Sequence, residues 1–179
     1  MGESVWTDRA DELLLRTASA EPTPGSGVAA AVAGAFGIAL VLKALTITDD
    51  DGCAAARARG EALVERVVAA ADADDEAFAE VIDADGDADA EQALARAAAV
   101  PLELAAALVD ALALAREGAP LVKPALESDV LGGADLVRGA ASVALRAAEL
   151  NVASLEEREA AGAPALRARL EVLREQLAE

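Results

Sequence analysis

Residues 28–46 constrain the fold most, because this stretch is apolar on every face except at Lys43. Its many alanines and glycines favour a helix that other helices approach closely, and they lack the bulk of a β-sheet core. A helix that is apolar all round is either a core helix or a membrane span, and about 19 residues suffice to cross a bilayer. The lysine, the few leucines and the lack of a second comparably apolar segment favour a central core helix.

The rest of the chain predicts an all-α protein, a single-domain helical bundle over residues 1–179 that forms a dimer. Small side chains give the apolar helix too little volume to fill a monomer core, which is one reason to expect a second subunit. No segment alternates with the period of a strand. Patterns and helix-forming residues predict further helices over 7–17, 54–71, 74–82, 88–99, 101–117, 135–150, 155–161 and 164–177. The segments 88–99 and 101–117 form either a helical pair or one kinked helix.

Charge and rare residues exclude several kinds of function. The chain has 33 acidic and 15 basic residues, a net charge of -18, which repels the phosphates of nucleic acids. Cys53 is the single cysteine and histidine is absent, so the sequence excludes an internal disulfide, a histidine-containing zinc site and a Ser-His-Asp triad. Any catalysis depends on carboxylates, hydroxyls and cations.

The acidic balance also bears on the environment of the protein. Lys43 and Lys123 are the only lysines, and aspartate and alanine are abundant. Hydrated carboxylates suit concentrated salt, where like-charge repulsion is screened, although a GC-rich genome favours a similar composition. The first residues lack a basic stretch followed by an apolar one, so we expect no signal peptide and a cytoplasmic protein without a membrane anchor.

Three segments carry a resemblance to a known family. The loop 18–27 and the start of the apolar helix resemble the ASPxPAPGGGSVAALAGALG opening of the formiminotransferase-cyclodeaminase and methenyltetrahydrofolate cyclohydrolase family. Residues 74–78, DDEAF, are similar to its DxxAF segment. Ser128-Asp129-Val130 with Asn151-Val152 is similar to its SD...NV element. The chain departs from the family pattern at Ser26, Val28, Thr46 and Asp49-Asp50.

The resemblance implies a helical subunit that dimerises and acts on a folate-bound one-carbon unit without a metal or a cofactor. The leading expectation is hydrolysis of 5,10-methenyltetrahydrofolate to 10-formyltetrahydrofolate, because the sequence contains no formiminotransferase segment. Release of ammonia from formiminotetrahydrofolate, the cyclodeaminase reaction, is the close alternative. A dimer that keeps the scaffold without chemistry is the third reading, favoured by the departures from the pattern.

Two aspartates are the candidate catalytic residues. Water addition to an amidinium carbon needs a carboxylate that accepts a proton and stabilises the cation, and the resemblance points to Asp74 and Asp129. Each also stands where a helix could begin, so the alternative role is an N-cap. Asp74 and Phe78 lie four residues apart on one helix face, which sets the carboxylate beside an apolar wall that would raise its pKa.

The remaining candidates would bind substrate. The backbone N–H groups of Gly25, Ser26 and Gly27 open a helix and suit the carboxylates of a folate tail, although small residues also serve close helix crossing. Asp129 and Asn151 are 22 positions apart, about 33 Å in a continuous helix. Either Gly132-Gly133 breaks that helix, or an antiparallel dimer brings one residue towards the other. Two further candidates for the folate carboxylates are Lys43 and Lys123, which are otherwise ordinary surface cations.

Overall fold

The computed structural model describes residues 5–7 and 9–179, which contain helices and no strand. The all-α prediction is therefore confirmed. The α-helices are α1 (Ala10–Thr17), α2 (Ser26–Thr48), α3 (Ala54–Asp83), α4 (Asp87–Gly118), α5 (Glu127–Glu157) and α6 (Ala163–Ala178). Short 3-10 helices are η1 (Val5–Thr7), η2 (Asp51–Cys53), η3 (Ala119–Leu121) and η4 (Pro124–Leu126).

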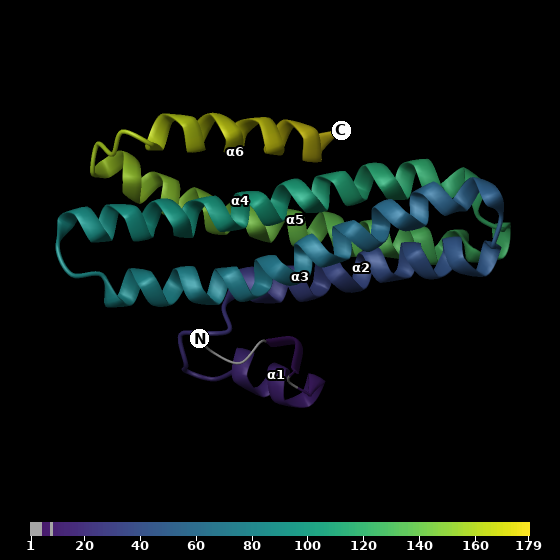
Figure 1. The fold of residues 1–179 in the computed structure, drawn as a ribbon, viewed down its shortest axis with the longest axis horizontal. Helices are drawn as coiled ribbons and strands as arrows, with labels where there is room; N and C mark the ends of the chain where they lie inside the picture. Colours follow the sequence, from purple (N-terminus) through teal and green to yellow (C-terminus); the bar gives the residue numbers. More distant parts are fainter. Residues whose placement is uncertain (1–4, 8) are drawn as a thin grey trace.

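Helices α2 to α5 run side by side along the long axis of the molecule (Figure 1). α5 packs most extensively against α4 and α2, and α6 folds back along α5 and α4. Leucine and valine side chains from all four bundle helices fill the core, among them Leu45, Val67, Leu108 and Val137. α1 stands apart from the bundle and has no buried residue.

Glycines set the distance between α2 and α5. A Cβ atom on Gly37 would lie 2.6 Å from the carbonyl oxygen of Gly133, so the two backbones touch at this point. The small residues of α2 therefore allow the close packing expected of them. One face of α2 nevertheless remains uncovered, and the side chain of Phe36 on this face is 63% exposed.

Two of the bundle helices, α3 and α5, are longer than the sequence patterns predict, and a third, α4, follows one of two predicted alternatives. The segments 54–71 and 74–82 join into α3, and the segments 88–99 and 101–117 form the single helix α4 with Pro101 in its interior. α5 runs unbroken from Glu127, so the predicted alternative of a break at Gly132-Gly133 is wrong. The buried side of each long helix is packed along its length, and this packing outweighs the weak local signals at glycine, aspartate and proline.

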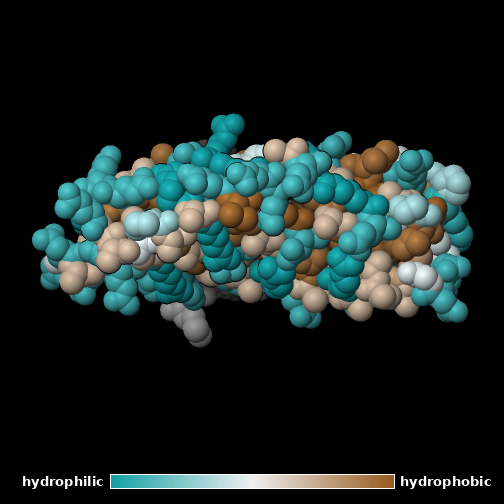
Figure 2. Space-filling view, turned by 90° about the horizontal axis from the view of Figure 1, so that it is seen from above, coloured by the Kyte–Doolittle hydropathy of each residue, from teal (hydrophilic) through white to brown (hydrophobic). Residues whose placement is uncertain are grey.

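The most apolar helices are partly buried inside the bundle. Within residues 5–7 and 9–179, two segments are long and apolar enough to cross a membrane, Ser26–Thr48 and Asp87–Leu121, so the expectation of a single such segment was wrong. In each, 56% of the most apolar window is buried inside the bundle. Hydrophilic side chains cover most of the face seen from above, on the side of α6 (Figure 2).

Candidate functional site

A pocket of about 260 Å³ lies beyond the N-terminal end of α2. α2 has 23 residues, whereas α3, α4 and α5 have 30 to 32 and continue past its start (Figure 1). The three longer helices therefore enclose space that α2 does not fill, and the loop before α2 covers it. The lining residues are Pro22, Thr23, Gly25, Ser26, Gly27, Asp74, Ala77, Phe78, Val81, Ala97, Ala147, Leu150 and Asn151.

Asp74 reaches from α3 to the first turn of α2. A Cβ atom on Gly27 would overlap the Asp74 carboxylate, so glycine is required at this close approach. The backbone N–H of Val28 donates a hydrogen bond to that carboxylate. Gly25 is the N-cap of α2 and supplies no side-chain cap, so the carboxylate of Asp74 takes this role from another helix. Asp74 is thus not the N-cap of its own helix, because it lies in the interior of α3.

Burial raises the pKa of Asp74 above its ordinary value, and the negative charge of Asp75 raises it further. The hydrogen bond from Val28 acts in the opposite direction and is the weaker influence. Asp75 has one carboxylate oxygen, Oδ1, that is buried without a hydrogen-bond partner. Asp74 is therefore a carboxyl group whose proton is held more tightly than that of a solvated aspartate, as a proton-transfer group requires.

Asn151 lies across the pocket on α5, and its side chain is hydrogen-bonded to the backbone of α4. Its Nδ2 donates to the carbonyl oxygen of Ala97 at 2.7 Å. In a regular helix that carbonyl would accept from residue 101, but Pro101 has no N–H. Asn151 thus satisfies the carbonyl that Pro101 leaves unpaired, which keeps α4 helical through the proline and fixes the amide at the pocket wall.

Three predicted site residues lie at the far end of α2. Lys43 Nζ and Asp129 Oδ2 form an ion pair at 2.9 Å, and Lys123 Nζ donates to the carbonyl oxygen of Ile47 at 2.9 Å. Gly27 and Lys43 are 16 positions apart on one helix, which corresponds to about 24 Å. The structure therefore brings together Gly25, Ser26, Gly27, Asp74 and Asn151, and it does not bring Lys43, Lys123 or Asp129 to them within one chain.

The pocket also contains residues that the sequence reasoning missed. Leu150 and Val81 add apolar surface beside Phe78. Val81 stands seven positions after Asp74 on the same helical face, so helical spacing could have identified it. Among the described residues that line the pocket, none is a cation, and Asp74 is the single one with a charged side chain.

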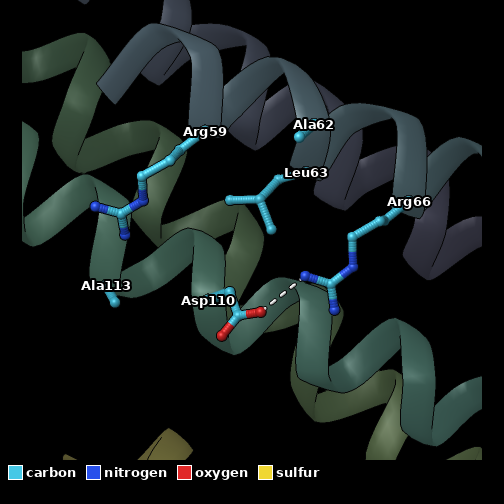
Figure 3. Close-up of a pocket in the computed structure, with 6 residues that line it drawn as sticks. All are labelled: Arg59, Ala62, Leu63, Arg66, Asp110 and Ala113. Carbon is cyan, nitrogen blue, oxygen red and sulfur yellow. Dashed lines mark hydrogen bonds and ion pairs between the residues drawn. The ribbon is translucent and has the colours of Figure 1, made fainter. Parts of the chain in front are cut away.

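A second groove, of about 270 Å³, lies between α3 and α4 (Figure 3). Arg66 Nη1 pairs with Asp110 Oδ2 at 2.8 Å, and Arg59 pairs with Glu117. Both arginines are thus neutralised by α4, and Asp110, the carboxyl group among the described residues that line this groove, is exposed, whereas Asp74 is partly buried. Within residues 5–7 and 9–179, no group of three or more Cys, Asp or Glu residues is arranged to hold a metal ion.

Comparisons with known proteins agree with the architecture. A protein-family model described as formiminotransferase-cyclodeaminase matches residues 9–169. The crystal structure of formiminotetrahydrofolate cyclodeaminase from Thermotoga maritima superimposes with a TM-score of 0.75 at 23% identity, covering 97% of this chain and 95% of that chain. This similarity shows a shared fold. A search of curated protein sequences gave no significant match.

Proposed function

The chain belongs to the formiminotransferase-cyclodeaminase family, and from this premise we propose that it hydrolyses 5,10-methenyltetrahydrofolate to 10-formyltetrahydrofolate in the cytoplasm. A tetrahydrofolate derivative is the substrate class that the family implies. The observation that carries the proposal is Asp74, a carboxyl group with a raised pKa at the wall of the pocket. The methenyl group is an amidinium cation, which a carboxylate attracts and stabilises.

Asp74 serves as the proton carrier in each step. Water adds to the methenyl carbon and gives one proton to Asp74, which leaves a neutral tetrahedral adduct. The bond from that carbon to N5 then breaks, the hydroxyl of the adduct loses its proton, and N5 gains one. The formyl group stays on N10, and one proton passes to solvent overall. Burial and the charge of Asp75 keep the pKa of Asp74 raised, and Phe78 and Leu150 add apolar surface to the same pocket.

The first turn of α2 approaches the reacting end of the substrate rather than its tail. The carboxylate of Asp74 already occupies this helix end, so a second carboxylate from the folate tail would be repelled. We therefore assign Gly25, Ser26 and Gly27 to close backbone contact with the ring that carries the one-carbon unit. The carboxylates of the folate tail then need a cation, and the described residues that line the pocket of one chain include none.

Cyclodeamination of 5-formiminotetrahydrofolate is the second candidate. The similar structure from Thermotoga maritima is named for this activity. The formimino group is also an amidinium, N10 attacks its carbon, and the leaving ammonia must receive a proton. Asp74 would accept the proton of N10 and return it to the departing nitrogen.

The test is turnover of each folate by the purified protein. We expect the absorbance of 5,10-methenyltetrahydrofolate to fall faster than in buffer, and Asp74→Asn to slow this by about 100-fold or more. Asp110→Asn, which changes an exposed ion pair far from the pocket, is the matched control. Asp129→Asn tests the other predicted aspartate. Ammonia release from 5-formiminotetrahydrofolate without methenyl hydrolysis would favour the second candidate. If neither folate reacts, the scaffold-only reading holds.

A further inference from the structure

We propose that Ser26 is a further catalytic residue of this site: its side-chain hydroxyl holds the water molecule that attacks the methenyl carbon, while Asp74 accepts a proton from that water. The role deepens the proposed function and rests on it, because a water molecule needs to be held only if the reaction is a hydrolysis. In cyclodeamination the attacking atom is N10, which belongs to the substrate. The hydroxyl of Ser26 therefore favours hydrolysis over release of ammonia.

Few side chains of the pocket can bind a water molecule. Among the described residues that line it, those with a hydrogen-bonding side chain are Thr23, Ser26, Asp74 and Asn151. The Nδ2 group of Asn151 already donates to the carbonyl oxygen of Ala97. The hydroxyls of Thr23 and Ser26 have no hydrogen-bond partner in the part of the chain that the structure describes. These two hydroxyls are therefore open to a bound molecule.

Position favours Ser26 over Thr23. Ser26 is the first residue of α2 and is exposed, whereas Thr23 stands three residues before the helix. The residue after Ser26 is Gly27, which lies against the carboxylate of Asp74. Adjacent Cα atoms are about 3.8 Å apart, and a water molecule hydrogen-bonded to two oxygens bridges about 5.5 Å between them. One water molecule can therefore bind both the carboxylate and the hydroxyl.

The family pattern has no hydroxyl at this position. In the segment PGGGSV of that pattern, glycine stands at position 26 and serine at position 28, whereas this chain has Ser26 and Val28. Val28 is 1% exposed, so a side chain at position 28 lies in the packed interior. Two positions along a helix correspond to a rotation of about 200°. The exchange thus moves the hydroxyl to the other side of α2, where Ser26 lines the pocket.

The hydroxyl completes the orientation of the attacking water. One hydrogen of the water is donated to the ionised carboxylate of Asp74 and the other to Oγ of Ser26, which leaves a lone pair for the methenyl carbon. When the C–O bond forms, the electron pair of the C=N bond moves to nitrogen and the first hydrogen passes to Asp74 as a proton. Ser26 keeps its own proton and is unchanged. It thus lowers the barrier by holding one reactant in place.

Removing the hydroxyl tests this role directly. Ser26→Ala should lower kcat for 5,10-methenyltetrahydrofolate about 10-fold or more, because the water is no longer held in place. KM should change little, since the folate itself loses no contact. Ser26→Thr keeps a hydroxyl at the same position and should retain most of the activity. The matched control is Ser142→Ala, which removes a hydroxyl that is bonded to the carbonyl oxygen of Arg138 outside the pocket.

Two further measurements separate this role from a structural one. The acidic limb of the pH profile of kcat should stay at the same pH in Ser26→Ala, because Asp74 and its neighbour Asp75 are retained. A limb that moves would show that Ser26 acts through Asp74, which overturns the inference. If the wild type also releases ammonia from 5-formiminotetrahydrofolate, that rate should be the same in Ser26→Ala. Equal losses in both reactions would show that Ser26 does not act on water.

Failure of this inference and failure of the proposed function give different results. If the wild type leaves 5,10-methenyltetrahydrofolate decaying at the buffer rate, the proposed function falls, and the role of Ser26 falls with it. If the wild type is active and Ser26→Ala has the same kcat, or differs only in KM, the proposed function stands and the inference is overturned. A loss of kcat in Thr23→Val but not in Ser26→Ala would assign the water to the other hydroxyl and would also overturn it.

Discussion

The Cα atom of Gly27 lies directly against the carboxylate of Asp74, and no side chain fits between them. This contact joins the start of α2 to the middle of α3 and lets one carboxylate cap a helix while it faces a pocket. Glycine at position 27, in the first turn of α2, is thus required for the close approach of the Asp74 carboxylate. Its position in the sequence gives no sign of this relationship.

Replacing Gly27 should therefore act through Asp74. In Gly27→Ala, the new methyl group overlaps the carboxylate and displaces it from the pocket. We expect folate turnover to fall about 100-fold, as when a proton-transfer group is lost, and stability to fall by about 1 to 3 kcal/mol from overpacking. Gly162→Ala is the control, since a Cβ atom there meets nothing within 4 Å. Unchanged activity in Gly27→Ala would remove Asp74 from the reaction.

Asp74 should also make stability depend on pH. Its folded-state pKa is raised, so folding favours the protonated form, and the contribution is fully present below the unfolded pKa and is lost as pH rises through the folded pKa. At pH 7, Asp74→Asn removes a partly desolvated charge and keeps an acceptor for the Val28 N–H, so its Tm should exceed that of the wild type. The difference should shrink as pH falls towards 4. A Tm difference that is independent of pH contradicts this.

The bond from Asn151 to Ala97 should be coupled to Pro101. Asn151→Leu leaves the Ala97 carbonyl unpaired and should cost about 1 to 3 kcal/mol of unfolding free energy. In a Pro101→Ala background the new N–H can bond to that carbonyl, so the same change should cost less. Urea unfolding of the four proteins of this double-mutant cycle measures the coupling. Additive effects would show that Asn151 does not compensate for the proline.

Salt should stabilise the protein. At molar potassium chloride the screening length falls to about 3 Å, which relieves the self-repulsion of a net charge of -18. Exposed ion pairs such as Arg66 with Asp110 are screened as well, but each contributes little. We expect the Tm to rise steadily from dilute to molar salt in calorimetry. A flat or falling Tm would reject adaptation to a saline environment.

The helical class and the loop before α2 could be predicted from the sequence, because both depend on local chemistry. Alanine and leucine favour helix wherever they stand, and Pro22, Pro24 and Gly25 interrupt it. Helix ends were harder to predict. Pro101 indicated a first-turn position, yet α4 runs through the proline. Asn151, 50 residues later in the sequence, donates a hydrogen bond to the carbonyl that lacks the N–H of residue 101.

The sequence by itself determined that this chain forms a helical bundle with a strongly acidic composition and a small-residue helix preceded by a constrained loop. The tertiary structure alone decided that Asp74 meets Gly27, that Asn151 faces the same pocket, and that Asp129 and Lys43 pair at the other end of α2. Helix propensity and hydrophobic periodicity act over a few residues, whereas these contacts between distant residues depend on how helices of unequal length align in the bundle. Because α2 starts short of its neighbours, the bundle leaves a pocket where the partly buried carboxylate of Asp74 can hold a proton.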